Sequence, residues 1–122
     1  MSVQCKTAVA FHIDDYNRLL SKLEQERFYG LVKNFILGAT RKQPPKADQY
    51  IALLFDWHDE FRNPGYEFLK NFLKELDDKD HPYDFIRIGE NIEDFEVTTE
   101  LGILELRREV GINVDMENEW LE

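Results

Sequence analysis

Residues 50–57 (Tyr-Ile-Ala-Leu-Leu-Phe-Asp-Trp) form an almost continuous apolar run in the middle of the chain. The run is too short for a buried helix and is rich in residues that favour strands. A strand that is apolar at successive positions is buried on both faces. We therefore predict that these residues form a central strand of a sheet, and the rest of the chain has to supply neighbouring strands and packing helices.

Two segments have the apolar spacing of helices. In residues 14–37 there are two apolar stripes, and the second is rotated by about 120° from the first. This phase shift predicts a break near residues 25–27, or a helix that is buried on two sides, with Asp14 or Asp15 as its N-cap. The second helix is predicted to begin at Asn63 and Pro64, an N-cap followed by proline at the first helical position.

Alternation of apolar and polar residues predicts further strands at residues 3–13, 84–88, 95–99 and 104–115. For the last of these, a helix over residues 99–110 capped by Gly111 is the competing interpretation. Residues 39–48 contain Pro44-Pro45 and are predicted to be a surface loop.

The expected fold class is α+β, with the order β-α-β-α-β-β-β. We expect a mixed or mostly antiparallel sheet of about five strands, with two helical segments packed on one face. The length of 122 residues is that of one domain, so residues 1–122 are expected to fold as a unit.

The chain has one cysteine, Cys5, which excludes an intramolecular disulfide and is expected to be a buried apolar side chain. No segment has the features of a signal peptide or the length of a membrane span. The sequence therefore predicts a cytoplasmic protein.

Charge is distributed unevenly along the chain. The formal net charge is −10, and all of it lies in residues 62–122, because residues 1–61 have equal numbers of acidic and basic residues. Without a long basic stripe, direct binding to nucleic acid is not expected. A partner protein with a basic surface is the more plausible ligand.

Residues 75–100 hold ten Asp or Glu against Lys79 and Arg87. Charges at strand edges commonly prevent edge-to-edge pairing, which is one explanation of this acidic stretch. The alternative is an acidic face that binds a basic protein. Its expected residues are Glu90, Glu93, Asp94, Glu96 and Glu100. A special case is a DNA mimic that occupies the basic groove of a nucleic-acid enzyme.

A second candidate site is a metal or acid–base centre at the end of the central strand. Asp56 and His58 are two residues apart, so they point to the same face of a strand. His12 or Asp14, at the end of the first strand, would supply a third group if the two strands are neighbours. A solvated turn between strand and helix is the competing interpretation.

Arg87 lies among apolar strand residues, where it could hold a carboxylate or phosphate of a ligand, or form a structural ion pair. No phosphate-binding glycine loop, dinucleotide fingerprint or zinc pattern is present, so no catalytic residue or cofactor is assigned. We therefore predict a small acidic interaction protein, a regulator or inhibitor, rather than an enzyme. Strands near the C-terminus could also pair in a homodimer.

Overall fold

A computed structural model describes residues 3–43, 48–59, 63–89, 95–107 and 111–114. Its main element is a five-stranded sheet in which every neighbouring pair is antiparallel, in the order β2-β3-β1-β4-β5. The strands are β1 (Val3–His12), β2 (Thr40–Lys42), β3 (Tyr50–Asp59), β4 (Tyr83–Ile88) and β5 (Phe95–Thr99). The predicted α+β class is thus confirmed, and the sheet is antiparallel throughout.

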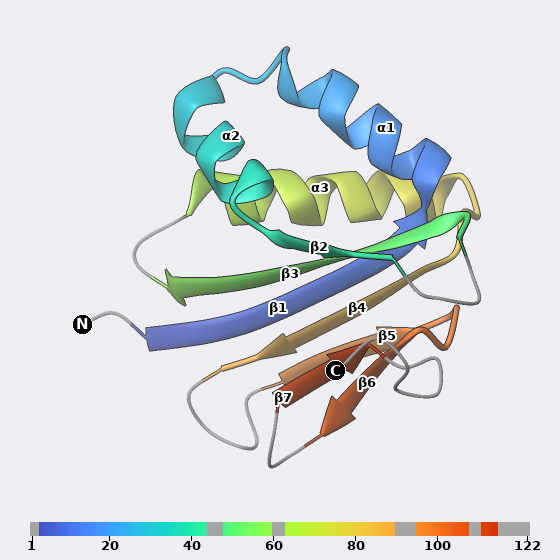
Figure 1. Ribbon diagram of the computed structural model, residues 1–122. Coiled ribbons are helices and arrows are strands. Elements are labelled where there is room, and N and C mark those ends of the chain that lie inside the picture. Colours follow the sequence, from blue (N-terminus) through green and yellow to red (C-terminus); the bar gives the residue numbers. More distant parts are fainter. Residues whose placement is uncertain (1–2, 44–47, 60–62, 90–94, 108–110, 115–122) are drawn as a thin grey trace.

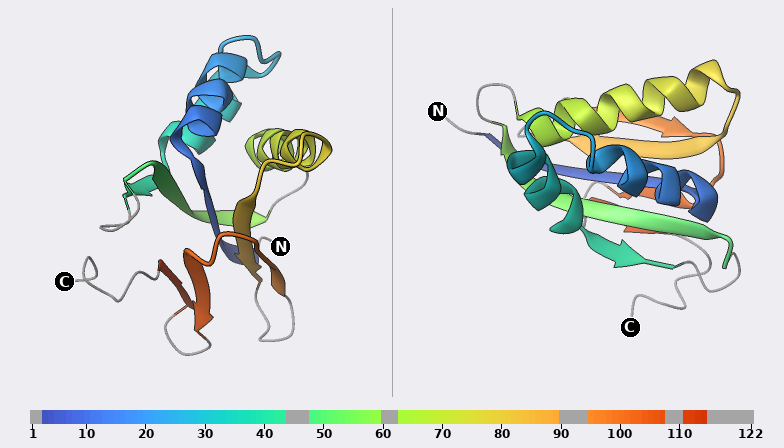
Figure 2. Two further views of the ribbon diagram at one scale, coloured as in Figure 1. Left: turned by 90° about the vertical axis from the view of Figure 1, so that its right-hand side faces the viewer. Right: turned by 90° about the horizontal axis from the view of Figure 1, so that it is seen from above.

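Three helices cover one face of this sheet (Figure 1): α1 (Ile13–Leu23), α2 (Tyr29–Leu37) and α3 (Pro64–Asp78). A hairpin of β6 (Leu104–Arg107) and β7 (Gly111–Val114) lies on the opposite face, as the end-on view in Figure 2 shows. From β1 to β4 the connectivity is that of the split βαβ arrangement, with α1 and α2 together in place of its first helix. β5 extends the sheet by one strand. The helices, the sheet and the hairpin form three layers (Figure 2).

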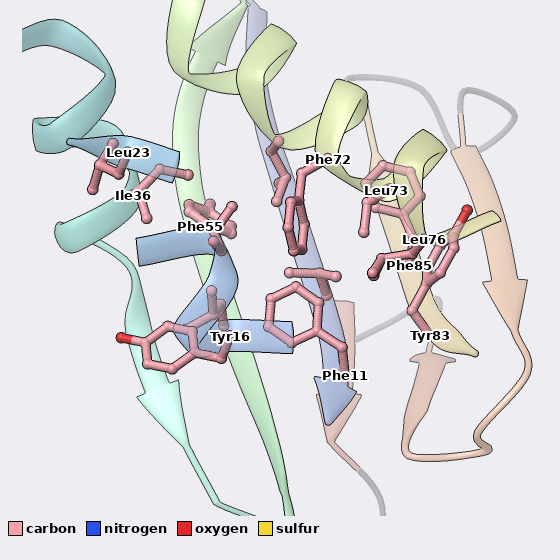
Figure 3. Close-up of a cluster of buried hydrophobic side chains, with 14 of the residues drawn as sticks. Phe11, Tyr16, Leu23, Ile36, Phe55, Phe72, Leu73, Leu76, Tyr83 and Phe85 are labelled. Atoms are coloured by element: carbon pink, nitrogen blue, oxygen red, sulfur yellow. The ribbon is translucent and has the colours of Figure 1, made fainter. Parts of the chain in front are cut away.

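The main core lies between the helices and the sheet (Figure 3). Phe11 of β1 meets Phe72 of α3 edge to face, with ring centroids 6.0 Å apart. Phe35 of α2 stacks on Phe55 of β3 at 4.8 Å. Cys5 is also buried in this core, as predicted.

A second core lies between the sheet and the hairpin. On this face the sheet presents the small residues Ala8, Ala10 and Ala52, and they pack with Ile103 and Leu104. Because alanine side chains are short, the hairpin segment can approach the sheet closely. The part of this face that Ala8, Ala10 and Ala52 form is therefore buried under the hairpin segment.

The helix boundaries follow local signals. α3 begins as predicted, because the Asn63 side chain accepts hydrogen bonds from the backbone N–H groups of Gly65 and Tyr66. The predicted break is also present, since α1 ends at Leu23 and α2 begins at Tyr29. The prediction that Asp14 or Asp15 is the N-cap of α1 is wrong. His12 caps the helix, because its side chain accepts a hydrogen bond from the Asp14 N–H, and Asp14 and Asp15 lie in the first turn.

Three predicted elements need correction. The loop at residues 39–48 contains the short strand β2, and the break between α1 and α2 gives three helices instead of two. The single strand expected over residues 104–115 is two strands, with Leu104 paired to Val114. Apolar and polar residues alternate in each arm of the hairpin, and the alternation has the same period in both arms, so the sequence resembles one long strand. The competing helix is not formed by residues 99–107.

In the part of the chain that the structure describes, no helix has the length and apolar character needed to cross a membrane.

Candidate functional site

The structure separates the residues predicted to form a metal site. β1 and β3 are neighbours, as that prediction required, but they are antiparallel, so His12 pairs with Tyr50 and Asp56 pairs with Lys6. These two positions are six residues apart along the strands, which is about 20 Å. His12 therefore does not join Asp56. His58 pairs with Gln4 through its backbone, and its side chain lies outside the described residues.

In the described residues, no three His, Cys, Asp or Glu side chains are arranged so that they could hold a metal ion. Asp56 is exposed on β3. His12 lies at the opposite end of the β1–β3 pair from Asp56. Its ring packs edge-on against the Tyr50 ring, with centroids 5.5 Å apart. Its Nδ1 atom accepts the Asp14 N–H at 3.0 Å and lies 3.5 Å from the Asp14 carboxylate.

A buried carboxylate stands beside His12. Asp15, in the first turn of α1, has a side chain that is only 6% exposed, and it pairs with Arg18 one turn later. His81 reaches the same carboxylate from the segment after α3, with Nδ1 3.0 Å from Asp15 Oδ1. The Arg18 guanidinium is 2.8 Å from the same Nδ1 atom. Nδ1 can donate to Asp15 or accept from Arg18, so the tautomer of His81 decides which bond forms.

These groups line a hollow of about 550 Å³ in the surface. Asp14 is the carboxylate in it that is most open to solvent, with 82% of its side chain exposed. The lining residues are His12, Asp14, Asp15, Arg18, Tyr50, His81 and Pro82. A hollow that combines carboxylates with an aromatic ring suits a cationic side chain, which would gain both ionic and cation–π contacts.

Further acidic residues continue from this hollow along the end of α3. The Tyr83 hydroxyl donates to Asp77 at 3.0 Å, and the Tyr83 N–H lies 3.4 Å from the Glu100 carboxylate. Burial of the phenol, its hydrogen bond to Asp77 and the charges of Asp77 and Glu100 raise the pKa of Tyr83 to about 12. Asp78 and Asp80 follow at the surface.

Figure 1 shows why these residues meet. The first turn of α1, the last turn of α3 and the start of β4 all lie at the right-hand end of the molecule. We call this region the acidic end. It comprises Asp14, Asp15, Asp77, Asp78, Asp80 and Glu100, together with the hollow.

The acidic residues at the C-terminal end of α3 are not explained by helix stability. A helix C-terminus carries partial negative charge, so carboxylates there are unfavourable. The last turn of α3 contains no basic residue. Asp80 has a φ of +57°, a left-handed conformation that aspartate and asparagine adopt more often than most other residues. Among the residues that the structure describes, neither Asp78 nor Asp80 forms an ion pair.

Arg87 lies opposite Glu96 in the register of β4 and β5, with Nε 3.9 Å from Oε1. Lys70 of α3 approaches the same carboxylate at 3.2 Å, and its ammonium group lies over the Phe85 ring. Arg87 is therefore engaged with a neighbouring strand, as a structural arginine would be.

The predicted acidic face is described only in part. Glu90, Glu93 and Asp94 lie outside the described residues. Of the other two, Glu96 is compensated by Lys70 and Arg87, whereas Glu100 belongs to the acidic end. Asp15, Glu75 and Glu96 are each paired with a cation.

Sequence reasoning missed the acidic end as a unit. The sequence patterns indicate Asp14 as an N-cap or, like His12, as a third group beside Asp56, and they assign no role to His81. The sequence signal for the acidic end is that acidic residues lie at the start of α1 and at the end of α3. The start of α1 and the end of α3 lie close together only because the two helices run in opposite directions, and apolar periodicity does not predict helix direction.

No family model matches this chain, and no curated protein or solved structure matches it either.

Proposed function

We propose that this protein is a small acidic interaction protein, a regulator or inhibitor, that binds a basic surface of another protein through its acidic end. The observation that carries the proposal is the pair of exposed carboxylates of Asp78 and Asp80 at the C-terminal end of α3. Neither forms an ion pair with a described residue, and His81, the residue after Asp80, lines the hollow together with Asp14 and Tyr50. The position of these two exposed carboxylates opposes the helix dipole, so a role in binding accounts for them better than folding does.

The hollow supplies the specific part of the interaction. A lysine or arginine of the partner would enter between Asp14 and Tyr50, while Asp78 and Asp80 attract the surrounding basic surface. Buried and well-packed contacts of this kind determine most of the affinity, whereas exposed charges mainly raise the association rate. Arg18 and His81 hold Asp15 in place beneath the entering side chain.

A cytoplasmic location, taken from the sequence, belongs to the same proposal. The two alternative functions, a DNA mimic and a metal-binding or hydrolytic domain, gain no support from the geometry of the described residues, and we do not carry them further.

The proposal can be tested with a defined probe before the partner is known. We would titrate the ¹⁵N-labelled protein with a short oligo-arginine peptide and follow the amide resonances. The expected shifts are at residues 12–18 and 77–83. The affinity should fall steeply as salt rises, because exposed charges are screened within about 10 Å at 0.1 M salt.

Two double variants with equal charge change form the matched comparison. Asp78→Asn with Asp80→Asn neutralises the acidic end, and Glu24→Gln with Glu67→Gln neutralises two exposed carboxylates at the opposite end of the helical layer. Only the Asp78/Asp80 variant should bind the peptide more weakly than the wild type, and adding Asp14→Asn to it should weaken the binding further. Equal loss in both double variants would mean that only net charge matters, and the proposal would be wrong.

The same variants then serve as baits in an affinity pull-down from a lysate of host cells. The expected result is one dominant protein that the wild type and the Glu24/Glu67 variant retain at low salt and release at high salt. The Asp78/Asp80 variant should not retain it. Retention by all three baits would place the binding surface elsewhere.

A further inference from the structure

The hollow of the acidic end contains two of the three histidines of the chain. His12 and His81 both line it, and the side chain of each is 39% exposed. The third histidine, His58, lies eight residues from Tyr50 along β3, which is about 27 Å. Histidine is the side chain whose charge ordinarily changes between about pH 5 and 8. The charge of the hollow is therefore expected to depend on pH in this range.

The other charged groups that line the hollow are two carboxylates and one guanidinium, those of Asp14, Asp15 and Arg18. While both imidazoles are neutral, the carboxylates outnumber the guanidinium by one, and the lining has a formal charge of −1. Two imidazolium groups would change this charge to +1. A hollow that attracts a cationic side chain in the first state therefore repels it in the second.

His12 stands next to the carboxylate that the lysine or arginine of a partner would contact. Its Nδ1 atom accepts the Asp14 N–H at 3.0 Å and lies 3.5 Å from the Asp14 carboxylate. A nitrogen that accepts a hydrogen bond carries no proton, so this arrangement belongs to the neutral ring. Once Nδ1 is protonated, it can no longer accept the N–H, and it pairs with the carboxylate instead. The charge of Asp14 is then compensated from within the chain.

His81 makes a similar contact with the second carboxylate. Its Nδ1 atom is 3.0 Å from Asp15 Oδ1 and 2.8 Å from the Arg18 guanidinium. Both ring nitrogens of an imidazolium are donors, so protonation makes the contact with Asp15 an ion pair and the contact with Arg18 repulsive. Asp15 is then shared by two cations, which leaves an excess of positive charge in the hollow.

The charged side chains on the neighbouring elements do not titrate with the histidines. At the end of α3 and after β5 they are Asp77, Asp78, Lys79, Asp80 and Glu100. Carboxylates ordinarily titrate near pH 4 and lysine above pH 10, so these side chains act as fixed charges between pH 5.5 and 7.5. Tyr83, with its pKa raised to about 12, stays neutral throughout this range.

We propose that the hollow is a pH switch: its neutral histidines admit a lysine or arginine side chain of a partner protein, and their protonation at mildly acidic pH expels it. The inference rests on the proposed function, because it concerns the regulation of that same site. His12 and His81 act as internal replacements for the cation, each beside one of the two carboxylates. Because coupling between sites is reciprocal, a bound cation disfavours the protonation of both rings.

The test measures the Kd of the oligo-arginine peptide at pH 7.5, 6.5 and 5.5 and at constant ionic strength, with the amide resonances of the ¹⁵N-labelled protein as the signal. Arginine stays charged over this range, so the peptide itself does not titrate. The Kd should rise about tenfold between pH 7.5 and 5.5, which is a typical size for coupling between two sites. Equal Kd values at the two ends of the range would overturn the pH switch.

The double variant His12→Asn with His81→Asn removes both imidazoles. Asparagine is a good N-cap, and at position 81 its amide can donate to Asp15 or accept from Arg18. Because the substitutions also alter the affinity at pH 7.5, the ratio of the Kd at pH 5.5 to the Kd at pH 7.5 is compared within each protein. This ratio should fall to near one in the double variant.

His58→Asn is the matched control, because His58 lies at the other end of β3 from the hollow. It should keep both the wild-type affinity and the wild-type ratio of Kd values. A pH dependence that persists in the double variant would arise from carboxylates, and one that disappears in His58→Asn would arise elsewhere in the chain. Either result would overturn the assignment of the switch to His12 and His81.

A measurement without peptide examines His12 alone. As pH falls from 7.5 to 5.5, the Asp14 N–H should lose its acceptor, so its resonance should move with the same midpoint as the His12 ring resonances. In His12→Asn the Asp14 resonance should not move in this range. A fixed Asp14 resonance in the wild type would contradict the role of His12.

The proposed function and the pH switch fail in different ways. If the peptide shifts no resonance of residues 12–18 and 77–83 at pH 7.5, the acidic end does not bind cations, and both proposals are wrong. If the peptide binds there at pH 7.5, with the expected dependence on Asp78 and Asp80, but binds equally well at pH 5.5, only the pH switch is wrong.

Discussion

Asp84 is fully buried in the sheet, and its carboxylate is held by backbone amides. Its two oxygens accept from the N–H groups of Leu101, Gly102, Ile103 and Leu104, at distances of 2.6 to 3.3 Å. The chain turns closely around this carboxylate, and Gly102 adopts a φ of +73° that favours glycine. One side chain thus fixes the path from β5 to the hairpin.

We expect Asp84→Asn to lower the free energy of unfolding by about 3 kcal/mol, measured by urea denaturation. The amide keeps the shape but turns an NH₂ group toward N–H donors, which leaves buried donors without acceptors. Amide hydrogens at residues 101–104 should also exchange faster. Asp56→Asn, at an exposed strand position, is the control and should change stability by less than about 0.5 kcal/mol. Equal effects of the two substitutions would show that the Asp84 contacts contribute little.

Tyr83 gives the protein a predicted dependence on alkaline pH. Its pKa is raised to about 12, so the folded protein keeps the phenol proton while the unfolded chain loses it near pH 10. Above pH 10 the unfolded state therefore binds fewer protons, and stability falls as pH rises toward 12, by about 2 kcal/mol in total. Tyr83→Phe should lose about 1 kcal/mol at pH 7 and have a shallower alkaline decline. Urea unfolding from pH 8 to 11.5 checks this, and parallel curves for the two proteins would contradict it.

At the scale of elements, α2 and α3 cross at a glycine. A Cβ added at Gly65 would lie 2.3 Å from the Phe35 Cβ, whereas a Cβ at Gly30 of α2 would meet nothing within 4 Å. Gly65→Ala should therefore destabilise the protein by about 1–3 kcal/mol through overpacking, despite the better helix propensity of alanine. Gly30→Ala should stabilise it by about 0.5–1 kcal/mol. Thermal unfolding of both variants checks the prediction, and changes of the same sign would contradict the helix crossing.

Some of the helices and strands could be predicted from local sequence patterns, and others could not. The break between α1 and α2 was predictable because two apolar stripes out of phase cannot face one core. The start of α3 was predictable because Asn63 and Pro64 act locally. β2 was missed because Thr40–Lys42 is short and lies at the edge, so it has little apolar signal. Residues 104–115 predict one strand where the structure has a hairpin, because the alternation continues through both arms.

The candidate site depended on information of a different kind. His12 and Asp56 lie on neighbouring strands, as supposed, but strand direction decides which ends meet, and no local pattern encodes it. The same reason hides the contact of His81 with Asp15, residues 66 positions apart in the sequence. Side-chain chemistry was readable from the sequence, whereas the convergence of those side chains required the topology.

For the whole molecule, the net charge of −10 opposes folding, because like charges are brought closer together in the compact state. Several carboxylates are relieved by local cations, as Lys22 relieves Glu75 at 2.7 Å. No cation among the described residues pairs with Asp78 or Asp80, and both lie at the negative end of α3. If the acidic end exists for binding, its charge should reduce stability.

This reasoning predicts a gain of stability when the charge is removed. Asp78→Asn with Asp80→Asn should raise the free energy of unfolding by about 0.5–1 kcal/mol at low salt, and asparagine tolerates the positive φ of Asp80. Glu67→Gln, in the first turn of α3, should have the opposite sign, because a carboxylate there is favourable. Both effects should shrink toward zero in about 1 M NaCl, where charges are screened within about 3 Å. Urea denaturation at both salt concentrations measures them. A double variant less stable than the wild type would mean that these carboxylates support the fold, and the argument that places them in a binding surface would lose its basis.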